Sequence, residues 1–262
     1  LNITTDSFSD GGEYLEPSAA LIHADRLLAE GADIVDIGAA SSHPDAAPVP
    51  PEVEIARLDA VIPALHNTGA SVSIDTFSTP VQRWALEQGV DYLNDIHGFA
   101  DPALYPDLAA SRAKLIVMHA VQERGIATRI DVPPSEILAR ITRFFDVRLN
   151  ALAAAGVARE RLILDPGMGF FLGTNPETSL TVLGRLPELA DIFGLPLLVS
   201  VSRKSFLKGL AGPGAGADIS AAVEMFAARQ GADYIRTHAP APLIQALKVL
   251  EELQESDLRQ AP

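Results

Sequence analysis

Six apolar runs of this chain end in residues that can do chemistry, and this pattern constrains the fold more than any other feature. The runs and the residues that end them are SVSID with Asp75; DYLND with Asn94 and Asp95; KLIVMH with His119; RLILDPG with Asp165; LLVSVSRK with Arg203 and Lys204; and DYIRTH with Arg236 and His238. They are rich in Val, Ile and Leu without alternation, which is typical of strands buried on both faces. Stretches with helical spacing separate them. The pattern predicts an α/β fold, a TIM (β/α)8 barrel, whose chemistry collects at the carboxyl ends of the strands.

The predicted strands cover residues 1–4, 32–38, 71–75, 91–95, 113–119, 161–165, 196–201 and 233–237. The first strand begins at Leu1 and is therefore predicted as a strand truncated at the N-terminus. Helices are expected over 18–30, 52–65 and 135–155, and Gly156 follows the last of these as a helix stop. The longest loops follow the first, second and fifth strands and should lie on one rim. Long loops in a compact domain usually serve a site.

Length and charge narrow the class of protein. A chain of 262 residues fits one barrel of roughly 250 residues, so residues 1–262 are expected to form a single domain. The chain has no Cys, which excludes disulfides and thiolate chemistry and is compatible with a cytoplasmic location. Its net charge of −14 makes nucleic acid and anionic membranes poor partners. No apolar stretch approaches the ~18 residues of a membrane span.

Three motifs follow predicted strands and suit an anionic substrate. DPGMGF, residues 165–170, places a carboxylate beside a Gly-rich turn, although a plain turn is an equally good interpretation of this motif alone. SRKS, residues 202–205, offers two cations and two hydroxyls, and Lys204 there could also be a solvated surface lysine. RTHAP, residues 236–240, leads into a helix. A common phosphate site of this fold uses the loops after the seventh and eighth strands.

Taken in order, these segments resemble one family. The chain is similar over nearly its whole length to dihydropteroate synthase, in the segments LNITTDSFSDGG, SIDT, LNDI, MH, LDPGMGF, SVSRKSF and YIRTH. AASSHPDAAPV, LNDIHGFADPALYP and DPGMGFFLG are similar more narrowly to the sulfonamide-insensitive synthases of mobile elements. The resemblance implies condensation of 6-hydroxymethyl-7,8-dihydropterin pyrophosphate with p-aminobenzoate to 7,8-dihydropteroate and pyrophosphate in folate biosynthesis. It also implies small-molecule substrates, a Mg²⁺ cofactor and a homodimer.

The resemblance further implies a role for individual residues. Asp75, Asp165 and Lys204 would be catalytic, with Asp75 facing the carbon that becomes cationic as pyrophosphate leaves. Asp165 would accept from the paired N–H donors of the pterin edge, and Lys204 would donate to its carbonyl. The other implied contacts are Asn94, Met118 and Arg236 with the pterin; Asn2, Ser42, His43, Arg236 and His238 with pyrophosphate; Ser202, Ser205, Phe170 and Phe171 with p-aminobenzoate; and Asn2 with Mg²⁺.

The chain departs from the commoner form of the family in three loops, the first of which has Thr4, Thr5 and Asp6 where that form has Thr-Pro-Asp. The second loop departs as well. That form has Ser-Thr-Arg-Pro where this chain has Ser41, Ser42, His43 and Pro44. A permanently charged Arg is thus replaced by a His, which offers no bidentate fork. The segment after DPG is also longer, and we expect Phe170–Gly173 to discriminate p-aminobenzoate from sulfonamides. Alternatively, its two aromatic rings pack inward and the added length is a tolerated insertion.

Two other functions stay open at this stage. Methyltetrahydrofolate methyltransferases share the pterin pocket, but SRKS, RTH and the DSFSDGG loop suit a pyrophosphate substrate that methyl transfer lacks. A non-catalytic pterin-binding paralogue would be expected to lose Asp75, Lys204 or the pair Arg236 and His238, and all are present. Asp75 could also cap the helix that follows it, and Asn94 could tie down a turn.

Overall fold

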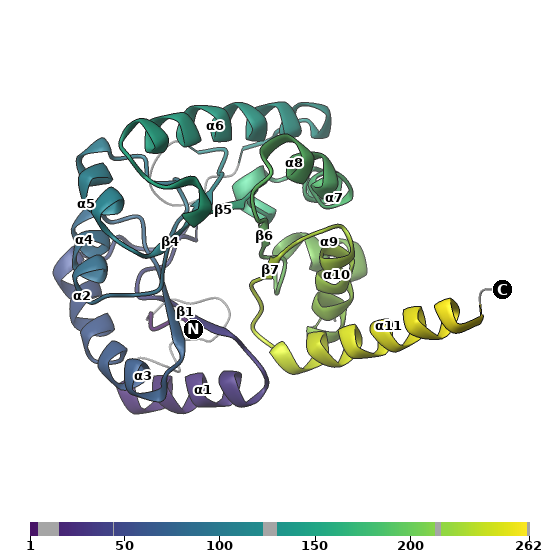
Figure 1. Ribbon diagram of the computed structural model, residues 1–262, viewed down its shortest axis with the longest axis horizontal. Helices are drawn as coiled ribbons and strands as arrows, with labels where there is room; N and C mark the ends of the chain where they lie inside the picture. Colours follow the sequence, from purple (N-terminus) through teal and green to yellow (C-terminus); the bar gives the residue numbers. More distant parts are fainter. Residues whose placement is uncertain (5–15, 44, 123–129, 213–215, 261–262) are drawn as a thin grey trace.

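Parallel strands stand side by side in chain order and helices surround them (Figure 1). The computed structural model describes residues 1–4, 16–43, 45–122, 130–212 and 216–260. The strands are β1 Ile34–Gly38, β2 Ser71–Asp75, β3 Tyr92–Asp95, β4 Lys114–Met118, β5 Leu162–Asp165, β6 Leu198–Val199 and β7 Tyr234–Ile235. Strands β1 to β5 form one parallel sheet and β6 pairs with β7. A bridge between Asn2 and Gly38 extends the larger sheet, and one between Leu164 and Leu197 links it to β6.

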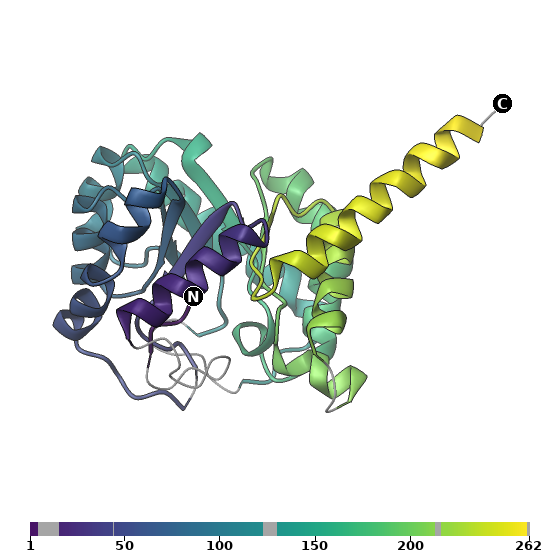
Figure 2. The same cartoon turned by 90° about the horizontal axis from the view of Figure 1, so that it is seen from below.

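The helices lie outside the strands, and α11 projects away from the rest (Figure 2). They are α1 Pro17–Ala29, α2 Pro51–Asp59, α3 Ile62–Thr68, α4 Thr79–Glu87, α5 Tyr105–Ala110, α6 Pro134–Ala154, α7 Pro176–Gly184, α8 Leu186–Phe193, α9 Ser205–Ala211, α10 Ala217–Arg229 and α11 Pro240–Gln260, with the 3₁₀ turns η1 Pro102–Leu104, η2 Arg159–Arg161 and η3 Gly169–Leu172. No helix in the described ranges combines the length and apolarity needed to cross a membrane.

The architecture confirms the predicted α/β TIM-barrel class. The helix predicted over 135–155 is α6, and Gly156 follows it with φ of 88°. The single helix predicted over 52–65 is wrong, because two helices, α2 and α3, occupy that stretch. Pro63 has no N–H and clashes with the preceding turn, so it fits the first turn of α3 and not the interior of a longer helix. The last two strands are shorter than predicted.

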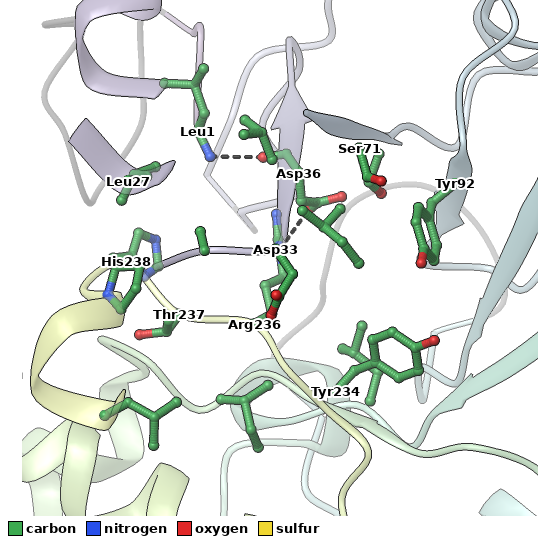
Figure 3. A pocket seen from close by; sticks show the side chains of 18 of the residues that line it. Leu1, Leu27, Asp33, Asp36, Ser71, Tyr92, Tyr234, Arg236, Thr237 and His238 are labelled. Atoms are coloured by element: carbon green, nitrogen blue, oxygen red, sulfur yellow. Dashed lines mark hydrogen bonds and ion pairs between the residues drawn. The ribbon is translucent and has the colours of Figure 1, made fainter. Parts of the chain in front are cut away.

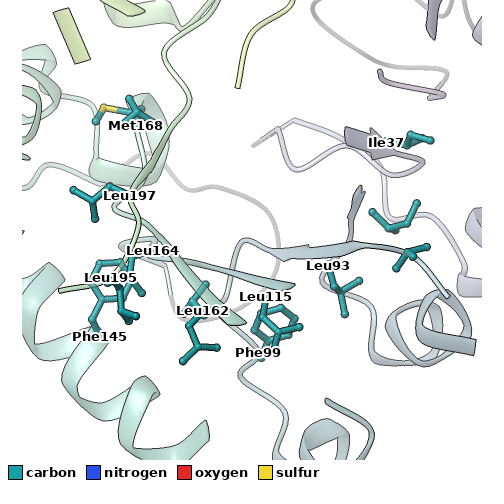
Figure 4. Packing of buried hydrophobic residues seen from close by; sticks show 14 of the residues in the cluster. Ile37, Leu93, Phe99, Leu115, Phe145, Leu162, Leu164, Met168, Leu195 and Leu197 are labelled. Atoms are coloured by element: carbon teal, nitrogen blue, oxygen red, sulfur yellow. The ribbon is translucent and has the colours of Figure 1, made fainter. Parts of the chain in front are cut away.

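Strands β2 to β6 are buried on both faces over most of their length, as their continuous apolar sequences require, whereas both residues of β7 are half-buried. Leu115, Val117, Leu162 and Leu164 belong to the large cluster between strands and helices, part of which Figure 4 shows. The alternate residues Ile116, Ile163 and Leu198 pack with one another on the other face. A smaller cluster of Ile96, Met118, Ala120 and Phe171 lies at the carboxyl ends of the strands and in the turns that follow them. This packing holds the strands in a register that brings their carboxyl ends together.

Candidate active site

Four of the predicted site residues are placed by the strands themselves. Asp75 ends β2, Asn94 lies in β3, Met118 ends β4 and Asp165 ends β5. The register pairs Asp75 with Asn94, and Met118 with Asp165. Because neighbouring parallel strands are separated by about 4.8 Å, these residues lie along one edge of the sheet. Asn94 is buried, and its Oδ1 has no hydrogen-bond partner within the described residues. That oxygen is therefore available to a ligand.

Arg236 directly follows β7, the last strand, and its side chain reaches this edge of the sheet. Its Nη2 donates to Asp75 Oδ2 at 2.8 Å. Its Nε lies 2.5 Å from Asp36 Oδ2 (Figure 3). Its backbone N–H donates to the carbonyl of Val199 at 3.0 Å, which fixes the start of the side chain. Sequence reasoning missed Asp36. An acidic residue within the apolar run ADIVDIG was the signal that could have found it.

Burial and neighbouring charges shift the pKa values of the carboxyl groups and of the lysine in the site. Burial raises the pKa of Asp75 to about 6, and Arg236 opposes that rise. Burial likewise raises the pKa of Asp165 to about 6, although its Oδ1 accepts the Gly167 N–H at 2.8 Å. Burial and the nearby Arg236 lower the pKa of Lys204 to about 8. Near neutral pH, ionised carboxylates and a charged lysine therefore coexist, although their pKa values have moved towards each other.

Lys204 lies beside the turn that follows β5. It is the N-cap residue of α9, and its Nζ is 5.0 Å from the centre of the Phe171 ring. Gly167 makes this turn with φ of 80°, and a Cβ there would lie 2.4 Å from the His119 carbonyl oxygen. Only glycine fits at that position. The DPG turn thus holds Asp165 and supports the segment that contacts Lys204.

Two polar residues that the sequence left without a clear role stabilise turns. Asp95 accepts hydrogen bonds from Gln82 Nε2 and from the backbone N–H groups of His97 and Phe99, at 2.8 to 3.0 Å. His119 is buried with its Nδ1 3.1 Å from the Pro166 carbonyl, and burial lowers its pKa to about 4. Both side chains thus hold the loops that frame the site.

The remaining predicted residues lie on the loops of the same rim. The His43 ring meets the Phe170 ring edge-on, with 5.9 Å between their centres, so the loop after β1 touches η3. Ser202 is buried and its Oγ accepts the His238 N–H at 3.3 Å. Ser42 precedes His43, and Ser205 is exposed at the start of α9. Asn2 pairs with Gly38 at the end of β1. The DSFSDGG motif and Pro44 lie outside the described residues.

A cavity of about 590 Å³ reaches the site from the side (Figure 3). It lies between Asn2 and β1 on one side and β7 and α11 on the other. Its lining includes Asn94, Arg236 and His238, together with Tyr92 and Tyr234 from the starts of β3 and β7. Asp75, Asp165 and Lys204 are not among its lining residues. The cavity therefore exposes only part of the polar cluster.

Comparisons with known proteins agree on one family. The profile of the pterin binding enzymes matches residues 1–238. The chain is 56% identical to dihydropteroate synthase type-2 of Escherichia coli over 98% of this chain and 95% of the relative. The dihydropteroate synthase of Yersinia pestis, solved with a sulfonamide drug complex, superposes with a TM-score of 0.87 at 33% identity, over 98% of this chain and 92% of that one. The dihydropteroate synthase of Xanthomonas albilineans, solved with 4-aminobenzoic acid, superposes with a TM-score of 0.84 at 34% identity, over 97% of this chain and 91% of that one.

Proposed function

The chain belongs to the dihydropteroate synthase family, and from that premise we propose how its own residues perform the reaction. The enzyme is a transferase of folate biosynthesis that joins 6-hydroxymethyl-7,8-dihydropterin pyrophosphate to p-aminobenzoate. The observation that carries our proposal is the meeting of Asp75, Asp165, Lys204 and Arg236 at one rim of the strands. Mixing the purified chain with both substrates and measuring released pyrophosphate tests it. No release would reject the assignment in favour of a non-catalytic pterin-binding protein.

The pterin would lie against the carboxyl ends of β2 to β5. Asp165 would accept hydrogen bonds from the pterin amino group and ring N–H, a paired charge-assisted contact that fixes orientation. The free Oδ1 of Asn94 and the ammonium of Lys204 would bind the rest of the polar edge. Met118 would form a wall, and Arg236 would lie over the ring face.

The reaction would proceed without a covalent enzyme intermediate. The bond between the pterin methylene carbon and the pyrophosphate oxygen breaks, and its electron pair leaves with pyrophosphate. Asp75 stabilises the cation left behind. The amine nitrogen of p-aminobenzoate, held by its carboxylate near Ser202 and Ser205, donates its lone pair to that carbon and then loses a proton. Arg236 has five N–H groups, so it can bind the leaving pyrophosphate with His238 while it stays paired to Asp75.

Magnesium is the cofactor that fits the residues present. Asn2 Oδ1 lies 3.7 Å from the position that a Cβ on Gly38 would take, so the absence of a side chain there leaves room at this amide oxygen. Among the residues that the structure describes, no three His, Cys, Asp or Glu side chains cluster as a metal site. One amide oxygen with phosphate oxygens and waters suits Mg²⁺. When bound, the ion would neutralise negative charge on the departing pyrophosphate.

Replacing Asn2 should change the metal dependence of the enzyme. Asn2→Ala removes the proposed protein ligand, so we expect the Mg²⁺ concentration for half-maximal rate to rise several-fold, while the rate at saturating Mg²⁺ falls little. Titration of pyrophosphate release with Mg²⁺ measures this. An unchanged titration curve would mean that substrate and water alone hold the ion.

The rate should depend on pH through three groups of the site. Asp165 and Asp75 must be ionised to act, and each has a pKa raised to about 6, so activity should rise as pH increases through that value. Lys204 must be protonated, and its pKa is lowered to about 8, so activity should fall above that value. A bell-shaped profile of kcat/KM for the free enzyme is expected. A flat profile from pH 5 to pH 9, in protein that stays folded by circular dichroism, would contradict these roles.

We also propose the wider setting of the enzyme. Residues 1–262 would form one pterin-binding barrel domain, acting on small molecules as a cytoplasmic homodimer. We propose in addition that the enzyme is insensitive to sulfonamides. The support for this is the segment Gly169–Leu172, which lies between the loop after β1 and Lys204.

A further inference from the structure

Glu224 is a buried acid that the proposed reaction does not use. It lies on α10, and only 1% of its surface is exposed. Burial raises the pKa of Glu224 to about 7, and interactions of its carboxyl group with the side chains of Thr237 and Ser202 oppose that rise. Its Oε1 is buried and has no hydrogen-bond partner within the described residues. Ser202 follows β6 and Thr237 follows β7. One carboxyl group therefore connects the two loops that carry Lys204, Arg236 and His238.

The hydroxyl groups of Ser202 and Thr237 also bind the backbone of the loop that follows β7. Ser202 Oγ accepts the His238 N–H at 3.3 Å, and Thr237 Oγ1 accepts the Ala239 N–H at 3.2 Å. Each hydroxyl has one proton, and since its oxygen accepts from the backbone, that proton is free to be donated to Glu224. The carboxyl group thereby orients both hydroxyls towards the loop that follows β7.

A second side chain of α10 acts on the loop after β6. Ser220 lies four residues before Glu224 and so faces the same side of the helix. It is buried, and its Oγ accepts the Arg203 N–H at 3.3 Å. Arg203 has φ of 57°, an unfavourable backbone conformation that such a contact helps to hold. Strands β6 and β7 are only two residues long, so their ladder alone gives these loops little support.

We propose that Glu224 is a positioning residue for the reaction, holding the loops after β6 and β7 at the separation that Lys204, Arg236 and His238 need to bind the pterin pyrophosphate together. This inference rests on the roles proposed above for those three residues. It predicts that loss of Glu224 weakens substrate binding and turnover beyond any loss of stability.

The test compares Glu224→Ala with Glu224→Gln. Gln has the same size, and its amide oxygen can accept from both hydroxyls, whereas Ala leaves the two hydroxyl protons without this acceptor. For Glu224→Ala we expect KM for the pterin pyrophosphate to rise roughly tenfold and kcat to fall by a similar factor, because displacements near 1 Å are costly in a site. Glu224→Gln should stay within about threefold of the parent in both constants, because the positioning contacts remain.

Asp233→Ala is the matched control for stability. Asp233 Oδ2 accepts the Leu197 N–H at 2.9 Å, so it also connects β6 to β7, but at the ends of the strands opposite the site. We expect this variant to lower the melting temperature and to leave KM and kcat near the parent values. An equal kinetic loss in Asp233→Ala would reduce Glu224 to general support of the fold.

Two further variants separate the possible failures. Arg236→Ala in the same assay tests the proposed role of the loop after β7, and parent-like activity of this variant would reject that role. If Arg236→Ala loses activity but Glu224→Ala has the kinetic constants of the parent, only the Glu224 proposal is rejected. If Glu224→Ala does not fold, Thr237→Val replaces it, since it removes one hydroxyl and keeps the shape. Thr237→Val should raise the same KM, and an unchanged KM would overturn the proposal. Equal losses in Glu224→Gln and Glu224→Ala would overturn it too.

Discussion

Asp75→Asn should lower kcat about a hundredfold, because a preorganised group that stabilises charge in a transition state contributes on the order of 3 kcal/mol. The substitution keeps the shape of the side chain and an oxygen that can accept from Arg236 Nη2, and it removes the negative charge. Binding of the pterin should weaken much less than turnover. Single-turnover measurement of pyrophosphate release, with pterin affinity from calorimetry, separates the two effects.

Asp36→Asn is the matched control for this experiment. Asp36 also pairs with Arg236, at 2.5 Å, but from β1. If Asp75 acts on the reacting carbon, Asp36→Asn should cost clearly less than Asp75→Asn. Equal losses would mean that both carboxylates serve only to hold Arg236. Parent-like kcat in Asp75→Asn would remove Asp75 from the mechanism.

Phe170→Ala should make the enzyme sensitive to sulfonamides, with an inhibition constant roughly a hundredfold lower and little change in KM for p-aminobenzoate. A sulfonamide replaces the planar carboxylate with a tetrahedral sulfonyl group that bears a further substituent, so a side chain beyond the substrate's outline can exclude the drug alone. Phe170 suits this role because it is half-buried and its ring meets His43 across the rim. Inhibition of pyrophosphate release by a sulfonamide measures the effect.

Phe171→Ala is the companion variant. Phe171 is buried with Met118 and Ile96 and lies against Lys204, so its loss should raise KM for the pterin more than it changes drug binding. Leu172 is fully buried in the main core, and deleting it would test stability and not selectivity. If both Phe variants stay insensitive, the discrimination lies elsewhere, and His43→Arg, which restores the common family residue, is the next variant to measure.

Much of this site could be predicted from the sequence, because of how parallel barrels are built. A strand buried on both faces must be apolar throughout, so the runs ending at Asp75, Asn94 and Asp165 were visible without a structure. Strands that alternate with helices in one direction place those ends on one rim, whatever the details of packing. The fold class and the candidates for substrate contact followed from these two facts and the family motifs.

Which polar groups contact one another was decided only by the tertiary structure. Strand-end Asp95 resembles Asp75 in sequence, yet it accepts hydrogen bonds from its own turn and from Gln82, whereas Asp75 pairs with Arg236. Glu224 resembles an ordinary surface acid of a helix, because its exposure depends on what packs against that helix. Hydrogen-bond partners such as Ser202 and Thr237 come from distant parts of the chain. The local sequence therefore determined where chemical groups could gather, and packing between distant segments determined which of them meet.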